Sequence, residues 1–200
     1  MIEERITLSK GQVLVKIADE HFIDWETQNQ IHILLNSTFG KKKSKSFINK
    51  TFARVEPEAR VLLYMDNALI GHMGISSDRL LVDGEYIGVG CLGLWCVDNI
   101  RDYTFKQEIA TNILLKSMNY LNKKKYTLGI GVTNSKAIEN KILPNIKSSV
   151  ISVPLYGENT KSKDNDKFLL FNCGVTDVFF SDVENKIIKQ GFVRVGKEVF

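Results

Sequence analysis

The chain has 200 residues, which fit one domain, or one domain with small appendages, and can bury a hydrophobic core. Its hydrophobic content of 44% and charged content of 25% are ordinary for a soluble globular protein, and no apolar stretch is long enough to span a membrane. The net charge of +4 comes partly from lysine runs at Lys41 to Lys45 and Lys123 to Lys125. These runs predict a solvated face rather than a nucleic-acid surface.

Cysteine use and the first residues indicate the cellular compartment. Three cysteines are present, and two of them, Cys91 and Cys96, lie in an apparent core strand. An odd number of cysteines, two of them in a core strand, predicts reduced thiols and a cytoplasmic protein rather than a disulfide framework. The first ten residues lack the apolar core of a secretion signal. No metal site is predicted, because Cys91 and Cys96 lack zinc-ligand spacing and no histidine is near them in sequence.

The first forty residues predict a strand followed by a helix. Residues Ile2 to Val15 are expected to form a strand with a lead-in, and Thr27 is a plausible N-cap for a helix that reaches Phe39 and ends at Gly40. The lysine run at Lys41 to Lys45 is expected in an exposed loop. Such a loop either borders a substrate entrance or is simply solvated.

Tight turns then connect a series of strands. Arg60 to Met65 and Ala68 to Ile75 are expected to form strands around an Asp66-Asn67 turn. A second turn, Asp83-Gly84, separates Arg79 to Val82 from Glu85 to Ile87. These segments predict an antiparallel meander.

The meander leads into the stretch around which the chain is organised. Tyr86 to Val97 has the aromatic, β-branched and glycine residues of a buried strand, and Asp98 to Thr104 is a polar turn. The following residues predict an amphipathic helix, with its apolar face at Ile109, Ile113, Leu114, Met118 and Leu121. A strand that turns directly into a helix presents free N–H groups and a positive dipole end, which predicts a phosphate site.

The remaining elements complete a mixed sheet. Tyr126 to Val132 is expected to return as a strand after the helix, which gives one β-α-β crossover. The segments that follow are expected to be a short helix at Ser135 to Leu143, a loop at Gly157 to Lys167, a strand at Phe168 to Cys173 and a helix at Asp182 to Lys189. We therefore expect a single α/β (α+β) domain over residues 1–200, with a mostly antiparallel sheet and flanking helices.

A glycine pattern in the buried strand resembles a nucleotide-binding motif. Residues 88–93 match G-x-G-x-x-G, but the strand continues through Leu94 to Val97 and the helix begins later. This order argues against a Rossmann site. Glycines inside a strand instead predict a bulge, or a place where a ligand or another backbone comes close.

The order of elements is that of the GNAT acyltransferases, and one segment resembles two related families more closely. Ala68 to Val97 is similar, without gaps, to a segment of the aminoglycoside 2′-N-acetyltransferases and of the nodulation N-acyltransferases. The shared features are His72 between small residues, an arginine near Arg79 and a glycine turn at Gly84. The likeness covers about two thirds of the chain.

The resemblance implies a coenzyme A site. In GNAT proteins the pattern Arg/Gln-x-x-Gly-x-Gly/Ala binds the pyrophosphate through backbone N–H groups. Counting back from Leu114 places it at Lys106 to Thr111, where the cation is kept and both glycines are absent. The implied cofactor-binding residues are Trp95, Cys96, Val97, Lys106, Gln107, Glu108, Ile109, Ala110, Thr111 and Asn134.

The resemblance also implies catalytic and acceptor residues. Cys91 and Gly93 occupy the sites of the family's strand carboxylates, and the late tyrosine that often acts as general acid is replaced near Asn140-Lys141. The implied catalytic residues are His72 and Cys91, and the implied substrate-binding residues are Gly93, Glu198 and Phe200. His72 would be either a proton acceptor, directly or through water, or a hydrogen-bonding residue that fixes its strand.

The expected activity is transfer of an acyl group, acetyl or longer, from a coenzyme A thioester to an amine such as that of an aminosugar or aminoglycoside. Two alternatives stay open. The chain is either a GNAT-like ligand-binding or interaction module without coenzyme A, or an acyltransferase that uses acyl carrier protein, with Lys41 to Lys45 facing the acidic partner. The other expected partners are a small-molecule amine and, as an open alternative, a second copy of the chain. No nucleic acid, membrane span or metal is expected.

Overall fold

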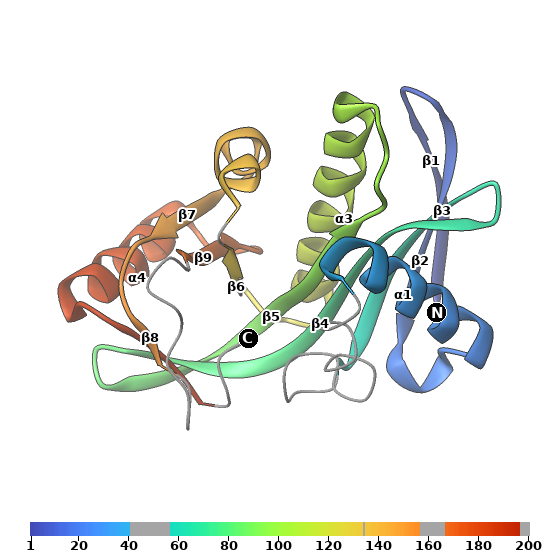
Figure 1. The fold of residues 1–200 in the computed structure, drawn as a ribbon. Coiled ribbons are helices and arrows are strands. Elements are labelled where there is room, and N and C mark those ends of the chain that lie inside the picture. The colour runs from blue at the N-terminus through green and yellow to red at the C-terminus, as the bar shows by residue number, and fades with distance from the viewer. Residues whose placement is uncertain (41–56, 134, 157–166, 197–200) are drawn as a thin grey trace. The chain divides into compact units, whose positions relative to one another are not determined.

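The computed structural model describes residues 1–40, 57–133, 135–156 and 167–196 (Figure 1). The chain forms two compact units. The first contains Met1–Ser76 and Gly93–Ser117, and the second contains Ser77–Leu92 and Met118–Phe200. The boundaries between the units fall inside two long strands, β4 (Ala68–Val82) and β5 (Glu85–Val97), and inside the helix α3 (Tyr103–Lys123). Each unit therefore contains part of each of these three elements.

In its described residues, the first unit has strands in the order β1-β2-β3-β4-β5. Its elements are β1 (Ile2–Leu8), β2 (Gly11–Asp19), a 3₁₀ turn (Glu20–Phe22), α1 (Trp25–Phe39), β3 (Ala59–Met65), the first part of β4 (Ala68–Val82), the last part of β5 (Glu85–Val97) and the start of α3 (Tyr103–Lys123). The expectation of one strand from Ile2 to Val15 is wrong. Residues Ser9-Lys10 make a hairpin turn, followed by Gly11 at a φ of 134°, so this segment forms two antiparallel strands.

The predicted tight turns are confirmed. Asp66 and Asn67 have φ values of 50° and 64°, and Asp83 and Gly84 have 52° and 85°. Positive φ at both central residues matches the right-handed twist of the strands that such turns connect. One boundary differs, because β4 is a single strand where the sequence predicts two. The polar residues Ser76 to Asp78 interrupt the apolar pattern without ending the strand.

Helix α1 covers the hydrophobic core of the first unit. Its N-cap is Asp24, whose carboxylate accepts a hydrogen bond from the Thr27 N–H at 2.7 Å, so Thr27 is not the cap. Gly40 ends the helix as expected, with a φ of 80°. The core residues shared by α1, its lead-in and the strands are Ala18, Ile23, Ile31, Leu34, Leu35, Leu62, Leu69 and Cys96.

The second unit continues β4 and β5 and adds the carboxy-terminal elements. These are β6 (Leu128–Thr133), a π-helical turn (Ile138–Ile142), a 3₁₀ turn (Leu143–Asn145), β7 (Ser148–Ile151), β8 (Leu155–Tyr156), β9 (Lys167–Asn172), α4 (Asp177–Gln190) and β10 (Val193–Val195). Strand β6 pairs in parallel with β5 after the intervening α3, which confirms the β-α-β crossover. Because β6–β9, β7–β9 and β10–β4 are antiparallel, the predicted mixed, mostly antiparallel sheet is also confirmed.

The late helix α4 closes the core of the second unit. It begins at Asp177 rather than Asp182, because the Thr176 hydroxyl accepts a hydrogen bond from the Phe179 N–H at 3.3 Å and serves as N-cap. Its side chains Phe180, Val183 and Ile187 are buried in the core of this unit. The short helix expected at Ser135 to Leu143 is present over residues 136–142, mostly as π-helix, and a 3₁₀ turn that contains Pro144 follows it.

The glycine pattern of β5 serves helix packing. A Cβ placed on Gly90 would lie 2.1 Å from Cδ2 of Leu121, a fully buried residue of α3. A Cβ on Gly88 would meet nothing within 4 Å. The glycines lie inside the strand and not in a turn between strand and helix, which is where a Rossmann site has them. Close approach at Gly90 is therefore by a helix side chain and not by a ligand.

We predict that Gly90→Ala lowers the free energy of unfolding by about 1–3 kcal/mol, because the new methyl group overpacks against Leu121. Gly88→Ala is the matched control and should change stability by less than about 1 kcal/mol. Urea denaturation of both variants measures the difference. A Gly90→Ala, Leu121→Ala double variant should be less destabilised than the sum of its single changes. Additive values would mean that the two residues do not contact each other.

Candidate active site

The backbone of strand β5 is irregular at Leu94, and we call this irregularity the Leu94 bulge. Its φ is 51°, whereas the neighbouring glycines Gly88, Gly90 and Gly93 do not have positive φ. A non-glycine residue in this region costs about 1–3 kcal/mol, so other contacts must hold it there. The sequence predicts an irregularity in this strand, but it places the bulge at glycine rather than at leucine.

A chain of buried polar side chains ends at the bulge. The His72 Nδ1–H donates to the Leu94 carbonyl at 3.1 Å, and Arg60 Nη1 lies 3.0 Å from His72 Nε2. Arg60 in turn donates through Nε and Nη2 to the two carboxylate oxygens of Glu20, at 2.5 and 2.6 Å. A carbonyl only accepts and a guanidinium only donates, so His72 must carry its proton on Nδ1 and accept at Nε2.

These contacts favour the second of the two roles considered for His72. The residue is 0% exposed, and burial, with the Arg60 charge as the smaller cause, lowers its pKa to about 3. Both ring nitrogens are engaged, so neither has a free lone pair for a substrate proton. His72 fixes its strand in this structure.

The two strand thiols are buried. Cys91 belongs to the hydrophobic core of the second unit, and Cys96 belongs to that of the first. Cys96 Sγ lies 3.9 Å from His72 Nδ1, and burial raises the pKa of this thiol. A protonated buried thiol is a poor nucleophile, so the structure offers no support for cysteine chemistry at Cys96. The predicted catalytic role of Cys91 is likewise unsupported by its place in the core.

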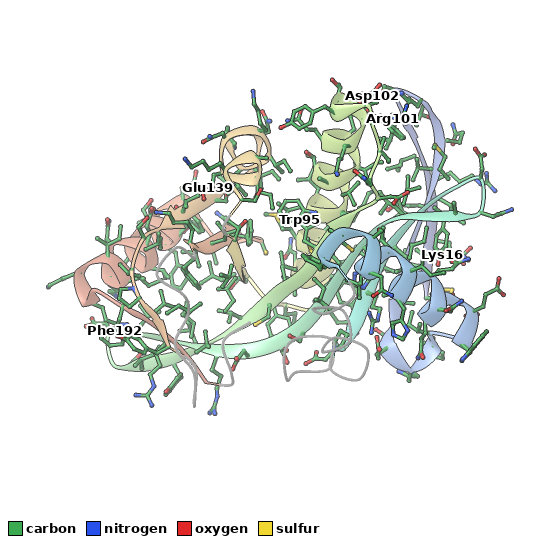
Figure 2. The ribbon with its side chains drawn as sticks, viewed as in Figure 1. Lys16, Trp95, Arg101, Asp102, Glu139 and Phe192 are labelled. Carbon is green, nitrogen blue, oxygen red and sulfur yellow. The ribbon has the colours of Figure 1, made fainter. Side chains whose placement is uncertain are left out.

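Trp95 follows the bulge and carries an unsatisfied donor. Its side chain is half-buried, and its indole N–H is buried without a hydrogen-bond partner among the described residues (Figure 2). Leaving such a donor unpaired costs about 1–3 kcal/mol. Among the predicted cofactor-binding residues of β5, Trp95 therefore has the clearest capacity to bind a ligand.

Helix α3 begins earlier than the predicted phosphate-binding residues. Its N-cap is Asp102, whose Oδ1 accepts from the Phe105 N–H at 3.0 Å and whose carbonyl accepts from the Lys106 N–H at 3.0 Å. The N–H groups of Lys106 to Thr111 therefore lie inside the helix and are used by it. The structure therefore gives no support to their predicted backbone contact with a diphosphate, because these N–H groups are used within the helix.

Two side chains of Lys106 to Thr111 also have other contacts. Glu108 Oε2 accepts a hydrogen bond from the Ser9 N–H at 2.9 Å, and Ile109 is fully buried. Lys10 Nζ lies 2.7 Å from Asp102 Oδ2, and the hydrogen bond from Lys10 is the main reason that the pKa of Asp102 is lowered. Arg101 is exposed beside this cap (Figure 2). Lys10 and Arg101 are not among the site residues predicted from the sequence, although Asp102, as a common N-cap residue, could have marked the helix start beside them.

The remaining predicted site residues have different places. Gly93 precedes the bulge, and Val97 ends β5 as a buried residue. Asn140 and Lys141 lie in the π-helical turn of the second unit. The residues Lys41 to Lys45, Asn134, Glu198 and Phe200 lie outside the described residues. In the part of the chain that is described, no cluster of metal-ligand side chains is present, and no helix is long and apolar enough to cross a membrane.

We predict that burial of His72 makes the protein less stable in mild acid. An unfolded histidine takes up a proton near pH 6.5 but folded His72 does so only near pH 3, so stability is full above pH 6.5 and falls as the pH drops below it. Between pH 7 and pH 5 this single group should lower the free energy of unfolding by about 2 kcal/mol. Urea denaturation of the parent and of His72→Asn at both pH values isolates the effect.

The direct check uses the folded parent, whose His72 ring resonances in a ¹⁵N NMR titration should stay those of a neutral Nδ1–H ring from pH 8 to pH 5. A ring that titrates near pH 6.5 would contradict the assigned hydrogen bonds.

Comparisons with solved structures place the fold. An aminoglycoside 6′-acetyltransferase type Ii matches with a TM-score of 0.59 at 16% identity, over 80% of this chain and 99% of that one. The GNAT family N-acetyltransferase YhbS from Escherichia coli, solved in complex with CoA, matches with a TM-score of 0.57 at 15% identity, over 91% and 88%. Escherichia coli ElaA matches with a TM-score of 0.55 at 8% identity, over 80% and 99%.

No protein-family pattern and no curated protein matches the sequence. The specific resemblance to the aminoglycoside 2′-N-acetyltransferases and the nodulation N-acyltransferases therefore stays a prediction. Similarity to solved structures at this level of identity shows the fold. The chain has the GNAT fold.

Proposed function

We propose that this protein is an N-acyltransferase that moves an acyl group from a thioester to an amine, with acetyl-CoA or a longer acyl-CoA as donor. The fold supports this proposal, and the observation that carries it is the unpaired indole N–H of Trp95 beside the bulge of β5. A buried donor without a partner on a strained strand is typical of a ligand site. A small-molecule amine, such as that of an aminosugar, is the proposed acceptor.

The end of β5 is suited to an extended ligand. The register between β5 and its parallel neighbour β6 covers Gly90 and Cys91, while β5 itself continues to Val97. Backbone groups of the last residues that do not pair with β4 can hydrogen-bond the amides of a pantetheine arm, as an added strand would. Trp95 and Val97 keep the binding role that the family resemblance implies, and Cys96 contributes its backbone because its thiol is in the core.

The diphosphate part of the donor fits best at the start of α3. With the helix beginning at Tyr103, the pattern Arg/Gln-x-x-Gly-x-Gly/Ala falls on Arg101 to Lys106, so that Arg101 supplies the leading cation. Tyr103 and Thr104 then place their N–H groups at the positive end of the helix dipole, where the Thr104 N–H also contacts the Asp102 carboxylate. Lys106 lies one turn into the helix and adds a second positive charge close to this end.

Direct attack of an amine on a thioester needs orientation, polarisation of the carbonyl and a proton acceptor. The Trp95 indole can donate to the thioester oxygen, or to the acyl or acceptor group beside it. The amine proton leaves through water, because His72 and the buried thiols are not available to accept it.

A second donor is favoured by the cap of α3. The Asp102 carboxylate already accepts hydrogen bonds from N–H groups of the first turn and is paired with Lys10, so this negative group competes with a diphosphate for the helix start. A carrier protein presents its acyl group on phosphopantetheine, which lacks the adenosine diphosphate of coenzyme A. An acyl carrier protein donor would therefore not require the start of α3 to bind a diphosphate.

We predict that Arg101→Glu weakens acetyl-CoA binding by more than tenfold, because it reverses a charge beside the diphosphate; tenfold corresponds to about 1.4 kcal/mol. Lys106→Glu should weaken binding less, since its side chain starts one turn further along the helix. Lys189→Glu on α4 is the matched control for net charge and should leave affinity unchanged. Isothermal titration calorimetry measures all three variants.

The same titration with acetyl-pantetheine separates the two donors. Much weaker binding than that of acetyl-CoA supports the coenzyme A donor, and equal binding that is insensitive to Arg101→Glu supports the carrier protein. If neither thioester binds the parent protein, the chain is a GNAT-like module without thioester binding.

We also predict that Trp95→Phe separates activity from stability. The substitution keeps an aromatic side chain and removes the unpaired donor, and the packing lost with the larger indole offsets this gain, so the free energy of unfolding should change by less than about 1 kcal/mol. The acylation rate constant should fall about tenfold or more, measured by release of the free thiol from acetyl-CoA. Tyr86→Phe, at the exposed start of β5, also removes one polar hydrogen from an aromatic side chain and is the control. An unchanged rate in Trp95→Phe would show that the indole N–H does not meet the reacting groups.

A further inference from the structure

We propose that Glu20, Arg60 and His72 form a positioning relay that holds the Leu94 bulge in the shape needed for acyl transfer. The relay is defined as the hydrogen-bonded chain from the Glu20 carboxylate through the Arg60 guanidinium and the His72 ring to the Leu94 carbonyl. None of its side chains touches substrate in this proposal. They act through the backbone of β5, and this catalytic part rests on the proposed function.

The relay connects four consecutive strands of the first unit. Glu20 directly follows β2, Arg60 lies on β3, His72 lies on β4, and the bulge is in β5. In the register of β3 with β4, Leu62 is opposite His72, so Arg60 and His72 are diagonal neighbours on the same face. The polar chain therefore runs across the strands and ends where the backbone of β5 is irregular.

Every polar group of the relay has a partner that matches its chemistry. Arg60, which is 4% exposed, is neutralised by Glu20 through two parallel hydrogen bonds from Nε and Nη2. Its remaining nitrogen, Nη1, donates to His72 Nε2. The neutral His72 ring carries its one N–H on Nδ1, and this N–H donates a hydrogen bond to the Leu94 carbonyl. Because a guanidinium cannot accept a hydrogen bond, Arg60 determines which His72 nitrogen faces the bulge as a donor.

The hydrogen bond to Leu94 also orients the residue that follows. A trans peptide is planar, so the C=O of Leu94 and the N–H of Trp95 point in opposite directions. Holding the carbonyl toward His72 turns the Trp95 N–H away from β4. The relay thus sets the direction of the peptide next to the unpaired indole, at the point where the thioester is proposed to lie.

Two substitutions at His72 test the relay. His72→Leu removes the hydrogen bond to Leu94, whereas the side-chain amide of His72→Asn can place a donor near the position of Nδ1. We expect His72→Leu to lower kcat at least tenfold with the KM for acetyl-CoA changed less than threefold, and His72→Asn to recover most of the loss. Amide hydrogen exchange of residues 93–97 should be at least tenfold faster in His72→Leu, with exchange in β9 unchanged.

A rescue experiment separates positioning from general stability. Glycine adopts positive φ without strain, so Leu94→Gly in the His72→Leu background should hold the bulge without the relay and recover at least half of the logarithmic loss in kcat. If His72→Leu does not fold, Glu20→Gln, at the partly exposed end of the relay, provides the weaker test with an expected loss of three- to tenfold.

Two results would overturn the proposal. Unchanged exchange at residues 93–97 in His72→Leu means that the relay does not hold the bulge. Faster exchange with an unchanged kcat means that the bulge does not position the reacting groups. The exchange measurement needs no activity, so it distinguishes failure of the relay from failure of the proposed acyltransferase function, in which the parent protein itself transfers no acyl group.

Discussion

A buried guanidinium imposes the strongest constraint on the first unit. Removing a charged group from water is unfavourable unless another charge and further hydrogen bonds compensate for it, and breaking such a buried pair costs about 3–5 kcal/mol. Arg60 is compensated by Glu20 on one side and by His72 on the other. Since those residues come from the ends or middle of different strands, the pairing fixes strand register and the bulge of β5 together.

A single acidic residue has a comparable effect on the proposed donor site. Asp102 fixes the first turn of α3, and in doing so it determines which N–H groups are free to bind an anion. Its own negative charge is balanced by Lys10 from the β1–β2 turn. The binding of a diphosphate would thus depend on rearranging an existing ion pair, which is exposed and therefore worth little in stability.

Local sequence signals predict the elements whose geometry is set by adjacent residues. The Asp66-Asn67 and Asp83-Gly84 turns and the end of α1 at Gly40 belong to this group, since positive φ favours these residue types. The bulge at Leu94 could not be predicted, because leucine disfavours its φ and the compensating hydrogen bond comes from His72, 22 residues earlier. The start of α3 was misplaced for a different reason: apolar spacing identifies the buried face of a helix but leaves its first turn undefined.

The glycines and the polar relay together explain why the residue with positive φ in β5 is a leucine and not one of the glycines of that strand. Gly71 and Gly90 are used where α3 side chains pack against β4 and β5, in the first and second units respectively. Their contribution is close packing, which leaves the irregular backbone of β5 to a residue with a side chain. Leu94 packs against the core of the first unit while its carbonyl is held by His72. A strained strand secured by a buried polar chain couples fold stability to the geometry of the proposed site. Substitutions that break this polar chain are therefore expected to lower the stability of the fold together with the activity, whereas glycine at position 94 relieves the strain and keeps the shape of the bulge.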